Sequence, residues 1–195
     1  MAKLYFKYGV MGSSKSAQAL ITQFNYEELG MTVWLIKPSI DTRDGADIIR
    51  SRIGLQRSAQ IITPEQNVAD EYHAAGKYDV IIADEAQFFT PEQIDQLRGI
   101  VDNEDVPVLC FGLRTDFLTR CFPGSKRLLE LADSITEIKT VCACGRKATV
   151  NARIGEDGHI ITQGDQVFLG GNDSYVAMCH KCWADKIKAQ QSEET

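Results

Sequence analysis

The stretch Gly9-Val10-Met11-Gly12-Ser13-Ser14-Lys15-Ser16 decides the fold. It follows an apolar segment at residues 4–8, typical of a buried strand, and it opens a segment at residues 15–29 whose apolar residues have helical spacing. A strand, a tight turn, a Lys-Ser pair and a helix are the layout of a phosphate-binding P-loop. Backbone N–H groups and the positive end of the helix bind phosphate oxygens in such a loop. We therefore expect all eight residues of the stretch to contribute to binding ATP.

Two side chains of this loop have specific tasks. Lys15 is expected to reach the β- and γ-phosphates, and the hydroxyl of Ser16 is expected to bind Mg²⁺. Ser14 departs from the usual G-x4-G-K-[ST] pattern, in which a second glycine lets the backbone approach phosphate closely. A polar turn before an ordinary helix is the alternative interpretation of the stretch.

A carboxylate pair provides the second half of a nucleotide site. Asp84 and Glu85 follow the apolar run Val80 to Ala83, which is typical of a buried parallel strand. Asp84 is expected to hold Mg²⁺ directly or through water, and Glu85 to lie near the reacting phosphate. A surface acidic pair at a strand end is the alternative, but the P-loop earlier in the chain favours the functional interpretation.

Composition excludes some classes of partner. The chain has 195 residues, and its formal net charge of −6 argues against a broad basic face for nucleic acid. Residues 1–7 contain no signal-peptide pattern, and no apolar run reaches transmembrane length. We therefore expect a cytoplasmic protein without nucleic-acid or membrane partners.

Strand and helix patterns alternate through the first 139 residues, which predicts an α/β domain with a mostly parallel sheet. Residues 46–58 read as irregular or partly helical, and residues 113–124 as a functional loop. Cys110 is expected to be plain core. Further strands are expected at 32–36, 60–62, 80–83, 106–112 and 135–139, and helices at 64–75 (with Pro64 as its first residue), 91–101 and 125–132.

The polar loop at residues 39–45 follows a strand of the same sheet and should lie near the nucleotide. Asp41 and Arg43 are its candidate ATP-binding residues. Arg43 could touch a phosphate, and a solvated loop arginine is the alternative.

The pattern changes after residue 140. Residues 140–190 read as a small β-rich lobe, with an Asp-Gly turn at 156–159 and a short helix at 183–190, and residues 191–195 as a polar tail. Cys142 and Cys144 form one close pair, and Cys179 and Cys182 form a second after 34 intervening residues. Two such pairs predict a structural Zn²⁺ site with four thiolate ligands. His180, inside the second pair, is a competing ligand, but we favour Cys182. Free cysteines or a redox pair are the alternatives.

Several motifs occur together in an order that resembles one family. They are the P-loop, Lys37-Pro38 with Asp41-x-Arg43, Asp84-Glu85-x-Gln87-Phe88, Gly112-Leu113-Arg114-Thr115-Asp116-Phe117, and the two cysteine pairs. Over residues 3 to about 185 the chain resembles thymidine kinase of the zinc-containing type shared by many bacteria and vertebrates. The departures are Ser14 and the C-x-C spacing of the first cysteine pair.

The resemblance implies a fold and an activity. The fold is a P-loop (RecA-like) domain, a mostly parallel sheet flanked by helices, with a small zinc lobe and a lasso or lid loop. The activity is transfer of the γ-phosphoryl group of ATP, with Mg²⁺, to the 5′-hydroxyl of thymidine or deoxyuridine for nucleotide salvage. A homotetramer and feedback inhibition by dTTP are also implied.

The resemblance also assigns residues. Glu85 matches the general base, and Ala86 and Gln87 continue the ATP-binding motif after Asp84. Residues that match the nucleoside-binding side are Met11, Phe88, Leu113, Phe117, Phe122, Gln166, Val167, Phe168, Leu169, Gly170 and Tyr175. Core packing is the alternative role of the three phenylalanines Phe88, Phe117 and Phe122.

Two rival functions remain. Asp84-Glu85-Ala86-Gln87 also resembles the acidic motif of P-loop ATPases that act on nucleic acid. The chain has no second motor domain, and its charge disfavours a nucleic-acid track. A zinc-ribbon nucleic-acid binder without catalysis would leave the P-loop and the acidic pair unexplained.

Overall fold

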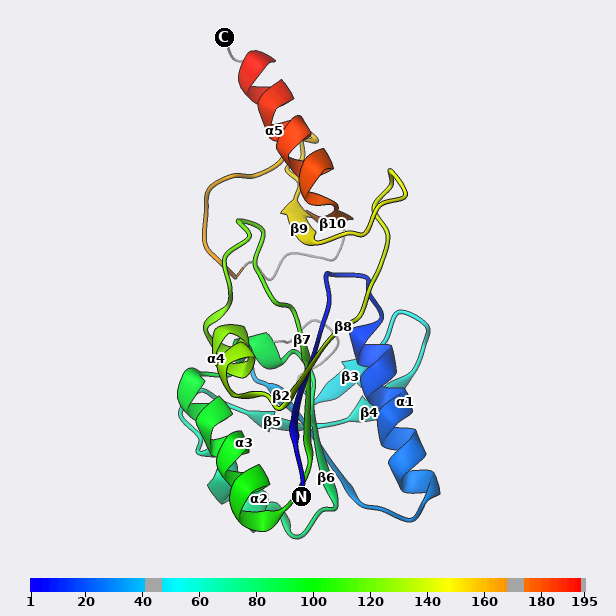
Figure 1. Ribbon diagram of the computed structural model, residues 1–195, viewed down its shortest axis with the longest axis vertical. Coiled ribbons are helices and arrows are strands. Elements are labelled where there is room, and N and C mark those ends of the chain that lie inside the picture. The colour runs from blue at the N-terminus through cyan, green and yellow to red at the C-terminus, as the bar shows by residue number, and fades with distance from the viewer. Residues whose placement is uncertain (41–46, 168–173, 194–195) are drawn as a thin grey trace.

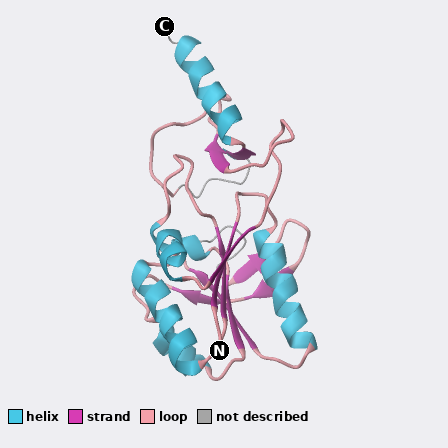
Figure 2. Ribbon diagram, viewed as in Figure 1, coloured by secondary structure: helices cyan, strands magenta, loops and turns pink. Residues whose placement is uncertain are grey.

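The computed structural model describes residues 1–40, 47–167 and 174–193. Its centre is a six-stranded sheet in the order β5-β2-β6-β7-β1-β8, in which all neighbouring strands are parallel (Figures 1 and 2). The predicted α/β class is therefore confirmed. The strands are β1 (Leu4–Tyr8), β2 (Val33–Pro38), β5 (Gln60–Ile62), β6 (Val80–Ala83), β7 (Val108–Gly112) and β8 (Ser134–Glu137).

Helices cover both faces of this sheet (Figure 1). Helix α1 (Lys15–Glu28) packs on one face, where Leu20 joins a buried cluster with Ile82 and Phe111. The other face is covered by α2 (Val68–Ala75), α3 (Pro91–Glu104) and α4 (Pro123–Leu131). Because both faces are buried, the central strands are continuously apolar, as in Val80–Ala83.

The strand order brings the two halves of the nucleotide site together. The P-loop follows β1 and the carboxylate pair follows β6, and β7 lies between these two strands. Carboxyl ends of parallel strands share one edge of the sheet, where open α/β sheets bind their ligands.

Residues 46–58 were expected to be irregular or partly helical, which is wrong for the described part, 47–58. Strands β3 (Ile48–Arg50) and β4 (Gln56–Ser58) form an antiparallel hairpin there. Ile49 is buried against the face of the sheet that α1 covers, and the turn uses Gly54 at a φ of +90°. Strand β4 consists of three exposed polar residues and so carries no apolar pattern, which explains the error.

Several predicted helices have different limits, among them α3, which runs to Glu104 rather than to residue 101, and α4, which covers 123–131 rather than 125–132. Helix α2 begins at Val68 rather than Pro64, because the side chain of Asn67 accepts hydrogen bonds from the N–H groups of Ala69 and Asp70. The Asn67 cap, and not Pro64, therefore determines where the helix begins. The C-terminal helix α5 (His180–Glu193) begins earlier and ends later than 183–190, so part of the expected polar tail is helical.

The zinc-lobe segment contains the antiparallel pair β9 (Val150–Arg153) and β10 (Tyr175–Met178). The expected Asp-Gly turn is present between Gly155 and His159, although β9 pairs with β10 rather than with a strand after this turn. Val10 of the P-loop is 8% exposed and packs into the apolar cluster of this lobe with Ala152 and Cys142. The lobe and the P-loop therefore share a core.

Helix α1 leaves part of its apolar surface uncovered. Ile21 and Phe24, which belong to the helical pattern, are 46% and 50% exposed, and Leu29 just beyond the helix is 76% exposed. The buried residues of the helix are instead Ala17, Ala19, Leu20 and Gln23.

None of the helices in the described part of the chain combines the length and apolar composition needed to cross a bilayer.

Candidate active site

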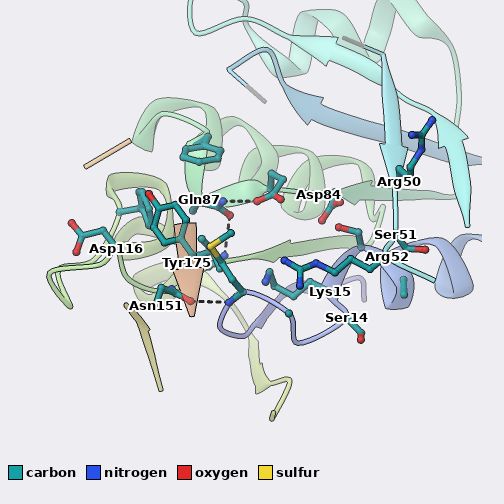
Figure 3. A pocket seen from close by; sticks show the side chains of 18 of the residues that line it. Ser14, Lys15, Arg50, Ser51, Arg52, Asp84, Gln87, Asp116, Asn151 and Tyr175 are labelled. Atoms are coloured by element: carbon teal, nitrogen blue, oxygen red, sulfur yellow. Dashed lines mark hydrogen bonds between the residues drawn. The ribbon is translucent and has the colours of Figure 1, made fainter. Parts of the chain in front are cut away.

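One large pocket lies where β1, β6 and β7 end, and most predicted site residues line it (Figure 3). The predicted residues in its wall are Met11, Gly12, Ser14, Lys15, Ser16, Asp84, Glu85, Gln87, Phe88, Leu113, Phe117, Phe122, Gln166, Val167 and Tyr175. The remaining predicted residues of this part, Gly9, Val10, Ser13 and Ala86, are buried beside it in the same loops. Asp41, Arg43, Phe168, Leu169 and Gly170 lie outside the described residues.

The P-loop places two residues in the left-handed region. Gly12 has a φ of +76°, and Ser14 has φ 64° and ψ 28°. A side chain in this region is strained, and such strain is typical of functional sites. Ser14 therefore adopts the conformation for which the usual pattern supplies glycine. Lys15 donates from Nζ to the carbonyl oxygen of Val10 at 2.9 Å, which folds its side chain over the loop.

Asp84 has the features of a divalent-cation ligand. Its side chain is 2% exposed and its Oδ1 makes no hydrogen bond, while the hydroxyl of Ser16 hydrogen-bonds to the carboxyl group. Burial and the neighbouring Glu85 carboxylate raise the pKa of Asp84 to about 7. A buried oxygen without a partner, beside a serine hydroxyl at a P-loop, suits Mg²⁺, which prefers oxygen ligands.

Glu85 is held in an unusual backbone conformation by its surroundings. It has φ 49° and ψ 37° and precedes the short helix η1 (Ala86–Phe88). Gln87 donates from Nε2 to Oε2 of Glu85 at 2.5 Å, and its Oε1 accepts from the N–H of Leu113 at 2.9 Å (Figure 3). A Cβ at Gly112 would lie only 2.6 Å from this Oε1, so glycine is required there. These contacts hold the side chain of Glu85 in the wall of the pocket.

The end of the pocket away from the β3–β4 hairpin is aromatic. Phe88 and Phe122 pack edge to face with ring centroids 5.5 Å apart, and Phe117 is 1% exposed beneath the guanidinium of Arg153, 3.8 Å from its ring. Phe117 and Phe122 are buried, Phe88 is partly exposed, and all three line the pocket. A flat apolar wall of this kind suits a nucleobase.

Asn151 on β9 is a pocket residue that the sequence analysis did not find. Its Oδ1 accepts from the N–H of Met11 at 2.7 Å, and its Nδ2 donates to the carbonyl oxygen of Thr115 at 2.9 Å. The side chain is 2% exposed. One buried amide thus joins the zinc lobe, the P-loop and the loop after β7. No local pattern signals such a residue, because its partners are 140 and 36 positions away.

A second set of contacts joins β9 and residues 165–166 to the aromatic end of the pocket. Arg153 donates from Nε to the hydroxyl of Tyr175 and from Nη2 to the carbonyl oxygen of Asp165. Gln166 donates to Oδ2 of Asp116 at 2.9 Å, and Asp116 also accepts from backbone N–H groups of its own loop. Hydrogen bonds of Arg153 and of Gln166 therefore hold the segments that border the aromatic end of the pocket.

The other wall residues that the sequence did not predict are Ala17, Ile48, Arg50, Ser51, Arg52, Ile53 and Thr115.

The four predicted cysteines form one cluster. Their sulfur atoms all lie within 4.8 Å of one another, and those of Cys144 and Cys179 are 3.6 Å apart. Tetrahedral zinc with Zn–S bonds of about 2.3 Å requires sulfur separations of about 3.8 Å, so the cluster fits this ion. Backbone N–H groups of Cys144 and Cys179 lower the pKa of Cys142 to about 6, which favours the thiolate that binds metal. His180 stacks near Trp183 and is not part of the cluster.

Comparisons with known proteins agree with this geometry. The family model described as thymidine kinase matches residues 2–183. This chain belongs to the thymidine kinase family. It is 47% identical over 188 residues to a thymidine kinase of Ruegeria pomeroyi, covering 95% of each chain. A thymidine kinase of Enterobacteria phage T4 is 45% identical over 191 residues, covering 96% of this chain and 98% of the phage protein.

A thymidine kinase of Legionella pneumophila is 48% identical over 183 residues, covering 92% of this chain and 88% of the relative. The expected resemblance to the thymidine kinase family is confirmed over most of the chain. Family membership makes the protein an ATP-dependent kinase and does not favour the nucleic-acid ATPase alternative.

Proposed function

We propose that this chain transfers the γ-phosphoryl group of ATP to the 5′-hydroxyl of thymidine or deoxyuridine, giving ADP and the nucleoside monophosphate. The observation that carries the proposal is the single pocket in which the P-loop and Asp84-Glu85 meet an aromatic wall. A phosphate-binding end and a base-binding end in one cavity suit a nucleoside acceptor. Membership of the thymidine kinase family selects thymidine among the nucleosides.

The phosphate end would work by positioning and charge. Lys15 would leave the Val10 carbonyl and bind the β- and γ-phosphates, while backbone N–H groups at the start of α1 bind phosphate oxygens. Asp84 and Ser16 would hold Mg²⁺, which neutralises charge on the triphosphate when bound. We extend this proposal to Asp41 and Arg43, whose positions the structure does not describe.

Glu85 would act as general base for the 5′-hydroxyl. The carboxylate would accept the hydroxyl proton as the 5′-oxygen forms its bond to the γ-phosphorus and the bond to the β-phosphate oxygen breaks. The hydrogen bond from Gln87 would keep Glu85 oriented toward the acceptor. Proton transfer needs this orientation, because a general base must lie within hydrogen-bond reach of the proton.

The aromatic end would bind the nucleoside. Phe117, Phe88 and Phe122 would contact the base and sugar, with Met11, Leu113 and Tyr175 completing the wall. Gln166 and Val167 lead into the segment Phe168-Leu169-Gly170, which we propose as the lid whose backbone binds the pyrimidine. A lid that excludes water would limit hydrolysis of ATP.

We propose that the cysteine cluster holds a structural Zn²⁺. Four thiolates would complete a tetrahedral shell and leave no open position for catalysis. Residues 140–190 would then form a zinc-stabilised substrate lobe beside a nucleotide-binding domain at residues 1–139. The contacts of Asn151 and Arg153 support a substrate role for this lobe, because they join it to the pocket from β9.

Assembly and regulation follow the family. We propose a cytoplasmic homotetramer, supported by the exposed Ile21 and Phe24 on α1, which a second copy would cover. We propose feedback inhibition by dTTP, which carries a thymine nucleoside for one end of the pocket and a triphosphate for the other. The net charge of −6 supports the absence of nucleic-acid partners, and we propose no membrane partner.

The decisive experiment measures ADP release with ATP and Mg²⁺, with and without thymidine, deoxyuridine, deoxycytidine and deoxyguanosine. We expect stimulation by thymidine and deoxyuridine alone. ADP release that no nucleoside changes would contradict the kinase proposal. The same assay with single-stranded DNA and RNA tests the ATPase alternative, which would require stimulation by nucleic acid.

A further inference from the structure

Two arginines of the β3–β4 hairpin line the pocket on the side of the P-loop. Arg50 ends β3 and donates from Nε to Oε1 of Gln56 at 3.2 Å, within the hairpin itself. Arg52, in the turn, makes no hydrogen bond or ion pair with the residues that the structure describes. Figure 3 shows the side chain of Arg52 extending toward Lys15, whereas Arg50 points away from it. Of these two arginines, Arg52 is therefore the one that presents an uncommitted guanidinium to the phosphate site.

The guanidinium of Arg52 lies against the P-loop. A Cβ built on Gly12 would be 3.7 Å from Nη1 of Arg52, which is ordinary contact distance. Gly12 is part of the turn whose N–H groups are proposed to bind the phosphates. Nη1 of Arg52 is therefore next to the place where the β- and γ-phosphate oxygens would lie.

The turn that carries Arg52 is fixed to the body of the protein. Ser51 is 6% exposed, and its Oγ accepts from the N–H of Leu55 at 3.0 Å and donates to the Leu55 carbonyl at 3.2 Å. Lys37 of β2 donates from Nζ to the carbonyl oxygen of Ile48 at 3.1 Å, and Ile49 is 3% exposed. The backbone of the hairpin is thus anchored, while the Arg52 side chain is exposed and free to close on a ligand.

The charged residues of the pocket wall indicate which cation could assist Lys15 at the phosphate end. In the described wall the cations are Lys15, Arg50 and Arg52, and the acids are Asp84, Glu85 and Asp116. Lys15 contributes one positive charge near Asp84, and this charge offsets part of the rise in the pKa of Asp84 that burial causes. Phosphoryl transfer spreads negative charge over the γ-phosphoryl oxygens and the leaving oxygen, and an arginine fork matches paired phosphate oxygens. Arg52 has both the position and the geometry to meet that charge.

We propose that Arg52 is a catalytic residue that contacts the β- and γ-phosphates of ATP and stabilises the charge of the transferring group. The inference rests on the proposed kinase activity. The bond from the γ-phosphorus to the β-phosphate oxygen breaks, the bond to the 5′-oxygen forms, and the hydroxyl proton goes to Glu85.

The test compares Arg52→Ala and Arg52→Lys with wild type by steady-state kinetics with ATP, Mg²⁺ and thymidine. We expect Arg52→Ala to lower kcat by on the order of 100-fold, less than the roughly 10³- to 10⁵-fold that arginine fingers supply in phosphoryl transfer, because this arginine is exposed. Arg52→Lys should keep part of the activity, because lysine supplies the charge without the fork. Added guanidinium ion, below concentrations that unfold the protein, should restore part of the activity of Arg52→Ala.

The matched control is Arg57→Ala, on β4 of the same hairpin, whose Nη1 donates to the Gln56 carbonyl and which is not part of the pocket wall. We expect its kcat to equal that of wild type, and all variants to keep the wild-type Tm. An Arg52→Ala enzyme with wild-type kcat would overturn the assignment, even if its KM for ATP rose. A wild-type protein that phosphorylates no nucleoside would instead contradict the proposed function.

Discussion

The side chain of Gln87 holds the side chain of Glu85 through a hydrogen bond of 2.5 Å from Nε2 to Oε2. The other end of the amide accepts from the Leu113 N–H, so Gln87 spans the distance from the carboxylate to the loop after β7. Gln87 is 1% exposed and has no freedom to move elsewhere. The proposed base and one wall of the proposed nucleoside site are therefore positioned by one residue.

Two substitutions of Gln87 test its contacts with Glu85 and with the Leu113 N–H: one removes both, and the other keeps only the second. We expect Gln87→Leu to lower kcat by about 10-fold with little change in the KM for ATP, since general-base catalysis depends on orientation. Gln87→Glu keeps an acceptor for the Leu113 N–H but sets a second carboxylate against Glu85. This variant should move the acidic limb of the kcat profile to higher pH, because like charges raise the pKa of a carboxyl group. Superimposable pH profiles for Gln87→Glu and wild type would show that Gln87 does not act through Glu85.

Removing the base itself should have a larger effect. We expect Glu85→Gln to lower kcat by roughly 100-fold or more, within the usual range for loss of a general base. Binding of ADP, measured by calorimetry, should persist, because the P-loop and Asp84 are unchanged. Unchanged turnover would remove Glu85 from the mechanism.

The sequence was most informative where function depends on residues close together in the chain. The P-loop, Asp84-Glu85 and the cysteine pairs have fixed local spacings, and the structure brings each set together as expected. Arg52 and Asn151 were missed for a physical reason. Their positions depend on how a short hairpin and a strand of the zinc lobe pack against the P-loop, and nothing in their own neighbourhoods encodes that packing.

The buried carboxyl of Asp84 should make the metal-free protein sensitive to pH. Its pKa is about 7 in the folded state against a reference value of 3.8, so between these values the folded protein holds a proton that the unfolded chain has released. The free energy of unfolding therefore falls as pH rises through this window. Asp84→Asn removes the titration and should be more stable than wild type at pH 8 by on the order of 4 kcal/mol, at about 1.36 kcal/mol per pKa unit.

Urea unfolding at pH 5 and pH 8 in Mg²⁺-free buffer measures this difference. The advantage of Asp84→Asn should be smaller at pH 5 than at pH 8, because pH 5 lies nearer the start of the window in which the unfolded chain has lost this proton and the folded protein has not. Addition of Mg²⁺ with ADP should stabilise wild type and leave Asp84→Asn almost unchanged. An advantage of equal size at both pH values would mean that Asp84 is not the group that titrates.

The zinc ligands can be tested by metal analysis. We expect Cys182→Ser to lose zinc and to bind thymidine more weakly, because the lobe would no longer hold the residues that lead into the lid. His180→Ala is the matched control and should keep one zinc per chain, since His180 lies outside the sulfur cluster. Full zinc content in Cys182→Ser together with loss in His180→Ala would reverse the ligand assignment.

Asn151 offers a test of how the lobe and the P-loop are coupled. Its amide satisfies the Met11 N–H on one side and the Thr115 carbonyl on the other, both within hydrogen-bond distance. Asn151→Ala loses both bonds and should raise the KM for ATP and for thymidine by on the order of 10-fold each, since small displacements of positioning groups are costly. Asn103→Ala, on an exposed position of α3, is the control and should leave both values unchanged.

Asn151→Asp distinguishes the two bonds. A carboxylate still accepts from the Met11 N–H, but it has no proton to donate and would face the Thr115 carbonyl oxygen with like partial charge. The KM for thymidine should therefore rise more than the KM for ATP, whereas Asn151→Ala should raise both equally. Equal rises in both variants would mean that Asn151 acts through packing alone. The predicted asymmetry would instead establish that a zinc-lobe residue positions the ATP side and the nucleoside side of the pocket through separate hydrogen bonds.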